Sequence, residues 1–89
     1  MATLFVHLKA QDYRAWRKVF DAATTTRTTY GCNGHKVFQS PSDLNEITVL
    51  MEWKNLDQAK AYSTSNDLRK VMKKAGVISQ PDMMFLAEA

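Results

Sequence analysis

The stretch Glu46-Ile47-Thr48-Val49-Leu50-Met51-Glu52-Trp53 decides the fold of this 89-residue chain. Successive side chains of a β-strand alternate between two faces. One face of this stretch carries Ile47, Val49, Met51 and Trp53, and the other carries Thr48, Leu50 and Glu52. Apolar side chains on both faces are typical of a strand covered on both sides. A chain of this length buries only about two-thirds of the surface of its unfolded form, so we expect a second copy to supply one of the covers.

The sequence before this stretch predicts a strand and a helix. Residues 3–9 alternate as a strand does. Asp12 can accept free backbone amides as a helix N-cap, and apolar residues recur at helical spacing over residues 12–24. Residues 24–34 are rich in β-branched, polar and glycine residues, which disfavour a helix, so we expect a long flexible loop there.

The remaining segments complete a β-α-β-β-α-β order. Residues 35–40 and 46–53 form a predicted hairpin, because residues 41–45 hold the proline, Asp and Asn typical of a turn. Asn55 caps a predicted helix over residues 56–62, and Ser65 or Asn66 restarts it up to Gly76. Pro81 precedes a last strand over residues 83–88. This order predicts one α+β domain over residues 1–89, a ferredoxin-like four-stranded antiparallel sheet with two helices on one face.

One face of such a sheet has no helices. We assign Leu4, Val6 and Leu8 to the helix face, which leaves Phe5 and His7 on the open face with Thr48, Leu50 and Glu52. The apolar residues expected on the open face are Phe5, Phe38, Leu50 and Phe85. A patch of this kind favours a homodimer through the open sheet faces.

Composition excludes several classes of protein. Hydrophobic residues make up 45% and charged residues 24%, as in an ordinary globular domain, and the formal net charge is +3. The cluster Arg69, Lys70, Lys73 and Lys74 is typical of a solvated helix face, so we expect no nucleic-acid partner. Apolar runs are far shorter than the roughly 20 residues of a membrane span, so we expect no membrane partner and no export. Cys32 is the only cysteine and fits no zinc spacing with the two histidines, which favours a reducing cytoplasm and no metal.

Several segments together resemble the dimeric α/β-barrel superfamily, close to antibiotic-biosynthesis-monooxygenase-like and cyclase-like proteins. These segments are the His7 strand, Asp12-Tyr13-Arg14-Ala15-Trp16, Thr48-Val49-Leu50-Met51-Glu52-Trp53, Ala59-x-x-Tyr62, and Ala75-Gly76-Val77 before Pro81. The resemblance implies a homodimer whose sheets enclose a cavity. The superfamily includes cofactor-independent monooxygenases, haem-degrading enzymes, cyclases and isomerases. Haem degradation is disfavoured, since the first strand has no asparagine and no histidine follows His35.

His7 is the candidate catalytic base. A histidine can transfer protons at neutral pH, and we expect Glu52 to orient it because we take the first and third strands to run parallel. Such a pair could abstract a proton beside a carbonyl during cyclisation or cofactor-free oxygenation of a phenolic or polyketide-like substrate, with no cofactor. The expected pocket for this small hydrophobic or aromatic molecule is lined by Phe5, Phe38, Leu50, Trp53, Tyr62 and Phe85.

Non-catalytic interpretations stay open for these residues. His7 can simply be hydrogen-bonded at a dimer interface, and Trp53 and Tyr62 can be core residues. Arg27 and His35 border the expected loop, where a ligand clamp or a plain solvated connection can lie. The alternative function is therefore a non-catalytic ligand-binding or stress-related accessory dimer.

Overall fold

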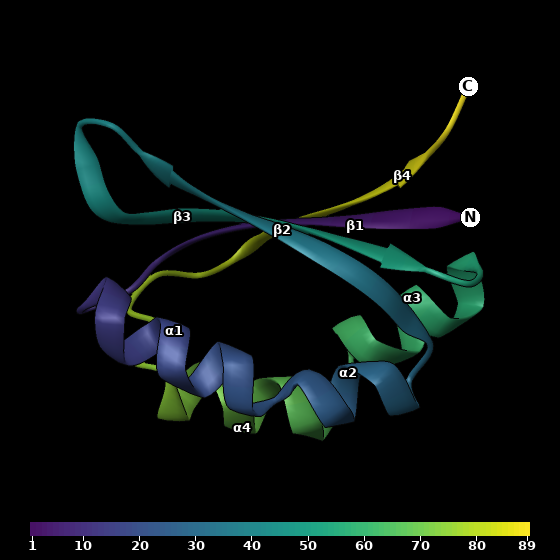
Figure 1. Cartoon of the computed structure of the whole chain (residues 1–89), viewed down its shortest axis with the longest axis horizontal. Helices are drawn as coiled ribbons and strands as arrows, with labels where there is room; N and C mark the ends of the chain where they lie inside the picture. Colours follow the sequence, from purple (N-terminus) through teal and green to yellow (C-terminus); the bar gives the residue numbers. More distant parts are fainter.

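A four-stranded sheet lies over a layer of helices in the computed structural model, which describes residues 1–89 (Figure 1). The elements are β1 (Ala2–Lys9), α1 (Tyr13–Ala22), α2 (Thr24–Thr29), β2 (Cys32–Ser40), β3 (Asp43–Trp53), α3 (Leu56–Ser63), α4 (Asn66–Lys74) and β4 (Asp82–Ala87). This arrangement confirms the predicted α+β ferredoxin-like fold. None of the helices has the length and apolar character that a bilayer crossing requires.

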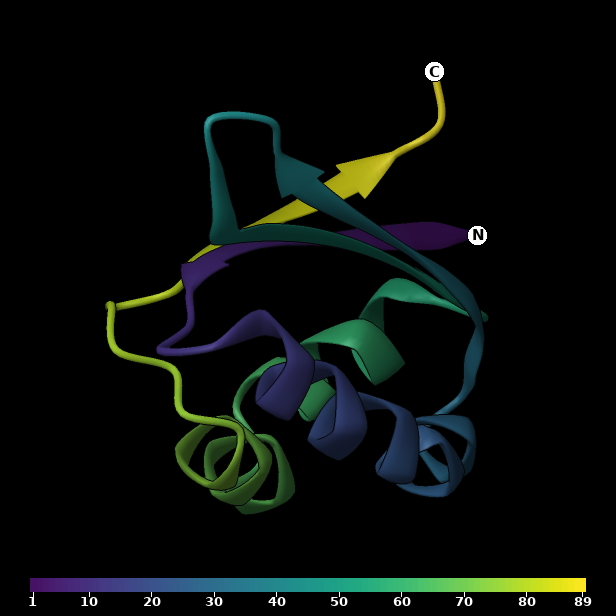
Figure 2. The same cartoon turned by 60° about the vertical axis from the view of Figure 1, so that its left-hand side comes forward.

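The sheet has the strand order β2-β3-β1-β4, and all neighbouring strands are antiparallel. The expectation that β1 and β3 run parallel is wrong. The helical crossover makes β1 and β2 parallel, and the hairpin then reverses the chain, so β3 runs opposite to β1. Both chain ends come to the same end of the sheet, where Ala2 pairs with Ala87 (Figure 2).

All helices cover one face of the sheet and leave the other face open (Figure 2). The alternation of β1 and β3 sets this division, as predicted from the sequence. The buried sheet residues that face the helices are Leu4, Val6, Leu8, Ile47, Val49, Met51 and Trp53. On the open face, Phe38 and Met84 are 49% and 52% exposed, so a substantial apolar surface has no cover within one chain.

Short polar side chains cap the N-termini of three helices at positions that the sequence predicts. Asp12, Asn55 and Ser65 accept hydrogen bonds from the backbone amides three residues later. Such a cap satisfies a helix-start amide that has no partner within the helix. Gly76, with φ of 76°, follows α4 in the left-handed conformation that glycine adopts most readily.

The expected long loop is instead mostly helix, because Thr24–Thr29 forms α2. Thr28 and Thr29 donate hydroxyl hydrogen bonds to the carbonyls four residues earlier, so these hydroxyls find their partners within the helix. Arg27 anchors the segment, since it is buried and donates to the Phe20 carbonyl at 2.7 Å. Tertiary contacts therefore override the weak helix propensity of threonine.

Candidate functional site

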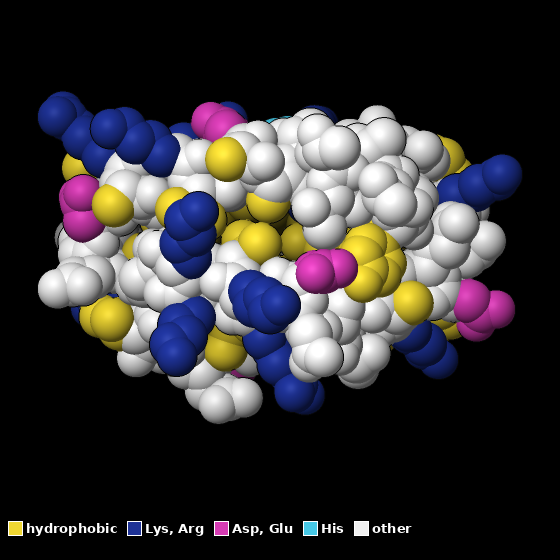
Figure 3. Space-filling model, turned by 90° about the horizontal axis from the view of Figure 1, so that it is seen from below, with side chains coloured by type: hydrophobic (Ala, Val, Ile, Leu, Met, Phe, Trp, Pro, Cys, Tyr) yellow, Lys and Arg dark blue, Asp and Glu magenta, His cyan; other side chains and the backbone are white.

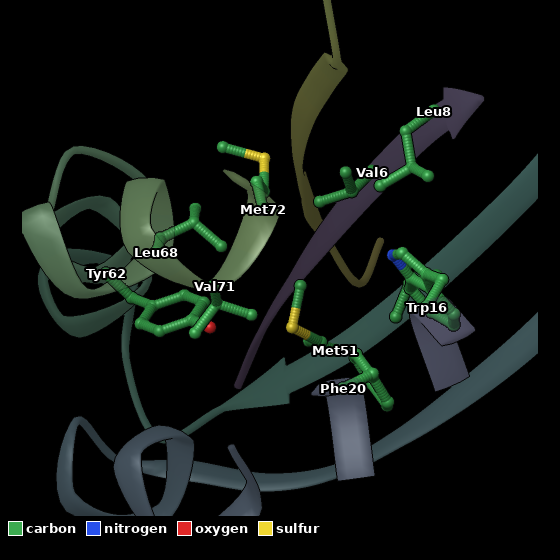
Figure 4. A pocket seen from close by; sticks show the side chains of 10 residues that line it. Val6, Leu8, Trp16, Phe20, Met51, Tyr62, Leu68, Val71 and Met72 are labelled. Atoms are coloured by element: carbon green, nitrogen blue, oxygen red, sulfur yellow. The ribbon is translucent and has the colours of Figure 1, made fainter. Parts of the chain in front are cut away.

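A cavity of about 30 Å³, the helix-side cavity, lies between the sheet and the helices. Its ten lining residues are all hydrophobic: Val6, Leu8, Trp16, Phe20, Val49, Met51, Tyr62, Leu68, Val71 and Met72. Figure 4 shows these side chains converging from β1, β3, α1, α3 and α4. The phenol of Tyr62 and the indole of Trp16 supply its only nitrogen and oxygen side-chain atoms. The cavity therefore suits an apolar group that carries few hydrogen-bonding atoms.

A groove of about 370 Å³, the α1–α4 groove, lies beside this cavity. It is lined by Lys18, Val19, Ala22, Ala23, Thr26, Val71 and Lys74. Val71 contributes to both spaces, so they are adjacent. The space-filling view of the helix layer shows apolar atoms at the bottom of a hollow, with several Lys and Arg side chains around it (Figure 3).

Tyr62 lines the helix-side cavity, and Arg27 packs against Phe20, another of its lining residues. Tyr62 is 1% exposed, and burial raises the pKa of its phenol, opposed by the charge of Arg27. Tyr62 therefore stays protonated at neutral pH and can donate a hydrogen bond. Burial also lowers the pKa of Arg27, which lies with its guanidinium carbon 3.8 Å from the centroid of the Phe20 ring.

The open face carries His7 between two carboxylates. Its Nε2 lies 3.1 Å from Glu46 Oε1, and its Nδ1 lies 3.7 Å from Asp82 Oδ2. Thr48 pairs with His7 on β3, and Phe38 pairs with Thr48 on β2, so all three share one row of the open face. His7 and Thr48 thus lie in a polar cluster with Glu46 and Asp82, on a face that also carries apolar side chains.

The expected contact between His7 and Glu52 is absent. Because β1 and β3 are antiparallel, Glu52 pairs with Thr3, four residues away from His7 and about 13 Å along the strand. Both Glu52 carboxylate oxygens accept from the Thr3 hydroxyl, at 3.1 and 3.0 Å. Glu46 takes the place at His7 that the sequence analysis gave to Glu52.

The six expected pocket residues fall on two faces of the sheet. Phe5, Phe38 and Leu50 lie on the open face, whereas Trp53, Tyr62 and Phe85 lie on the helix side. Placing Phe85 on the open face is wrong, because it pairs with the inward-facing Leu4. Its neighbours Met84 and Leu86 take the open-face positions, a one-residue shift that moves side chains to the other face.

Residues 1–74 match the family model of antibiotic biosynthesis monooxygenases. The chain belongs to this family. The chain matches none of the curated protein sequences.

Solved structures with low sequence identity to this chain share its fold. A Bordetella bronchiseptica protein described as an antibiotic biosynthesis monooxygenase aligns with a TM-score of 0.81 and 15% identity over 99% of this chain and 96% of that one. SnoaB of Streptomyces nogalater, a cofactor-independent oxygenase, gives a TM-score of 0.76 and 10% identity, covering 98% and 91%. A Caulobacter crescentus protein with the same family description gives a TM-score of 0.76 and 18% identity, over 99% of this chain and 89% of that one.

Sequence reasoning identified Tyr62 but missed the rest of the helix-side cavity. Trp16 and Phe20 belong to the apolar helical pattern over residues 12–24, and Leu68, Val71 and Met72 belong to the apolar pattern of α4. Their periodicity gives the buried face of each helix, yet whether a gap remains between packed side chains is decided only in three dimensions. Trp53 lies against the cavity wall, with its ring centroid 5.0 Å from that of Tyr62.

Proposed function

We propose that this chain binds a small aromatic or polyketide-like molecule in the helix-side cavity and oxygenates it without a cofactor. The observation that carries this proposal is an entirely hydrophobic cavity with a buried, protonated tyrosine at its wall, in a member of the antibiotic biosynthesis monooxygenase family. Fold likeness to SnoaB is consistent with the reaction class.

The lining suits an aromatic ring. Trp16 and Phe20 stack with ring centroids 4.8 Å apart, and Met51 and Met72 supply flexible side chains that adapt to different shapes. A space of about 30 Å³ holds no more than a water-sized group, so a ligand must displace side chains. Val71 and Met72 are only partly buried, and Val71 also lines the α1–α4 groove, so they are the side chains that we expect to move.

The lining also restricts the substrate chemistry. It holds no carboxylate or histidine, so we infer a substrate acidic enough to lose a proton to water, such as an acidic phenol or a methylene between two carbonyls. The substrate carbanion then gives two electrons to dioxygen and forms a carbon–oxygen bond. The peroxide anion takes back from water the proton that the substrate lost. The resulting hydroperoxide eliminates water and leaves a carbonyl, so one oxygen atom stays in the product and the other leaves as water. Tyr62 would donate a hydrogen bond to the oxyanion of the substrate.

We also propose that two copies pair through their open sheet faces. The exposed apolar side chains Phe38, Met84 and Leu86, with the half-buried Phe5 and Leu50, supply the surface for this contact. Removing such a surface from water favours association. The dimer would cover the row that contains His7.

A second candidate places the ligand between the two sheets, with His7 as the base. The position of His7 between Glu46 and Asp82 favours it, because a carboxylate can orient an imidazole for proton transfer. The sheet separates His7 from the helix-side cavity, so a ligand can contact one of the two sites only.

Two substitutions and a control distinguish these sites. Val71→Phe fills the helix-side cavity, and His7→Gln removes the candidate base. The control is Ile78→Phe, which adds a ring at a side chain that is 61% exposed. We would measure 1-naphthol binding by calorimetry and oxygen consumption with acidic phenols. We expect Val71→Phe to lose both 1-naphthol binding and oxygen consumption, and the other two variants to keep both.

Two other outcomes would favour the alternative functions. Loss of oxygen consumption in His7→Gln, with binding intact, would favour the site between the sheets. Binding without oxygen consumption of any tested phenol would favour a non-catalytic binding protein. Far-ultraviolet circular dichroism checks that each variant is folded.

A further inference from the structure

The α1–α4 groove has a cationic rim next to an apolar cavity. We propose that this groove binds the carboxylate of the ligand, so that the natural ligand is an aromatic or polyketide-like carboxylate whose ring enters the helix-side cavity. This inference rests on the proposed function and adds the ligand's charge and direction to it.

The two spaces fit the two ends of such a molecule. Lys18 on α1 and Lys74 on α4 both line the groove, and Val71 lies at its border with the cavity. Ala22 and Ala23 are small, which leaves room above the helix surface. A ring inserted past Val71 therefore leaves its substituent in the groove near the two ammonium groups.

No carboxylate of the chain neutralises these lysines. Salt bridges on the protein involve Lys9, Arg17 and His7, and none involves Lys18 or Lys74. Asp21, the only acid of α1, is bound by Arg17 at 3.0 Å. Asp67, the only acid of α4, accepts from the Tyr30 hydroxyl at 3.0 Å. The helix pair thus keeps a surplus of positive charge at the groove.

The surplus is large for two short helices. α1 carries Arg14, Arg17 and Lys18, and α4 carries Arg69, Lys70, Lys73 and Lys74, against one acid on each helix. Such a field attracts anions and weakens as salt screens it. The Thr26 hydroxyl also lines the groove and donates to no protein acceptor, unlike that of Thr24, so it is available to a carboxylate oxygen.

A pair of matched probes tests the proposal. 1-Naphthoate and 1-naphthamide have the same ring system and nearly the same shape, but only the first carries a charge at pH 7.5. We would measure the Kd of both by calorimetry for the wild-type chain, Lys18→Gln, Lys74→Gln and the double variant. Lys70→Gln is the control, because it removes the same charge from α4 at a residue outside the groove lining.

We expect wild-type protein to bind the naphthoate about tenfold more tightly than the amide at low salt. Each groove substitution should weaken naphthoate binding about threefold, as expected for one solvated ion pair, and leave the amide unchanged. Equal binding of both probes by the wild type would overturn this inference and leave the proposed function standing. An equal effect of Lys70→Gln would also overturn it, since it would show only a general positive field. Failure of both probes to bind would contradict both proposals.

Discussion

Arg27 lies over the ring of Phe20, with its guanidinium carbon 3.8 Å from the ring centroid, and donates from Nη1 to the Phe20 carbonyl at 2.7 Å. The same side chain donates from Nη2 to the Thr24 hydroxyl. It therefore ties α2 to the end of α1 and holds the ring that forms one wall of the helix-side cavity.

Replacing Arg27 should destabilise the chain strongly. Arg27→Leu leaves the Phe20 carbonyl without its charged donor, and we expect a loss of about 2–4 kcal/mol in the free energy of unfolding. Arg27→Lys keeps the charge but lacks the planar guanidinium, so it should lower the free energy of unfolding by less than Arg27→Leu does. Urea unfolding followed by circular dichroism measures both. A leucine variant as stable as the wild type would show that the contact contributes nothing net.

His35 should make stability depend on pH. Partial desolvation and the charges of Arg27 and Arg17 lower the pKa of His35 below its ordinary 6.5. The unfolded chain then binds the proton more readily than the folded chain, so stability falls as pH drops below about 6.5. Urea midpoints at pH 7.5 and 5.5 should differ less in His35→Gln than in the wild type. An unchanged difference would exclude His35 as its source.

Two glycines with positive φ should differ in their tolerance of alanine. At Gly76, with φ of 76°, an added methyl meets only the Gln11 side chain at 3.7 Å, so Gly76→Ala should cost about 1 kcal/mol for the backbone alone. At Gly31, with φ of 104°, the methyl also overlaps the Gln58 amide, so Gly31→Ala should cost more. Adding Gln58→Ala should recover the difference. Equal losses in both single variants would argue against the overlap.

The open face should hold a dimer together. Light scattering at micromolar concentration should give about 20 kDa, twice the mass of the 10.1 kDa chain. Leu50→Lys places a charge beside Phe5 in the middle of this face and should give a monomer. Leu56→Lys, on α3 and 42% exposed, is the control and should stay dimeric. A wild-type monomer at this concentration would rule out the proposed pairing.

Residue patterns predicted the fold because each element has a local cause. The alternation over residues 46–53 sets which side chains of β3 face the helices. The caps Asp12, Asn55 and Ser65 bind backbone amides only three residues later. The errors concern distant contacts. Helix α2 depends on the burial of Arg27, and the partner of His7 depends on the direction of β3. The helix-side cavity depends on how side chains from five elements pack, which no sequence pattern records.

Methyl resonances during a titration with 1-naphthol test the location of the site most directly. We expect the largest shifts at Leu68, Val71 and Met72, which line the helix-side cavity, with little change at Leu50 and Met84 on the open face. If Leu50 and Met84 shift most instead, binding in the helix-side cavity is wrong and the ligand lies between the sheets beside His7.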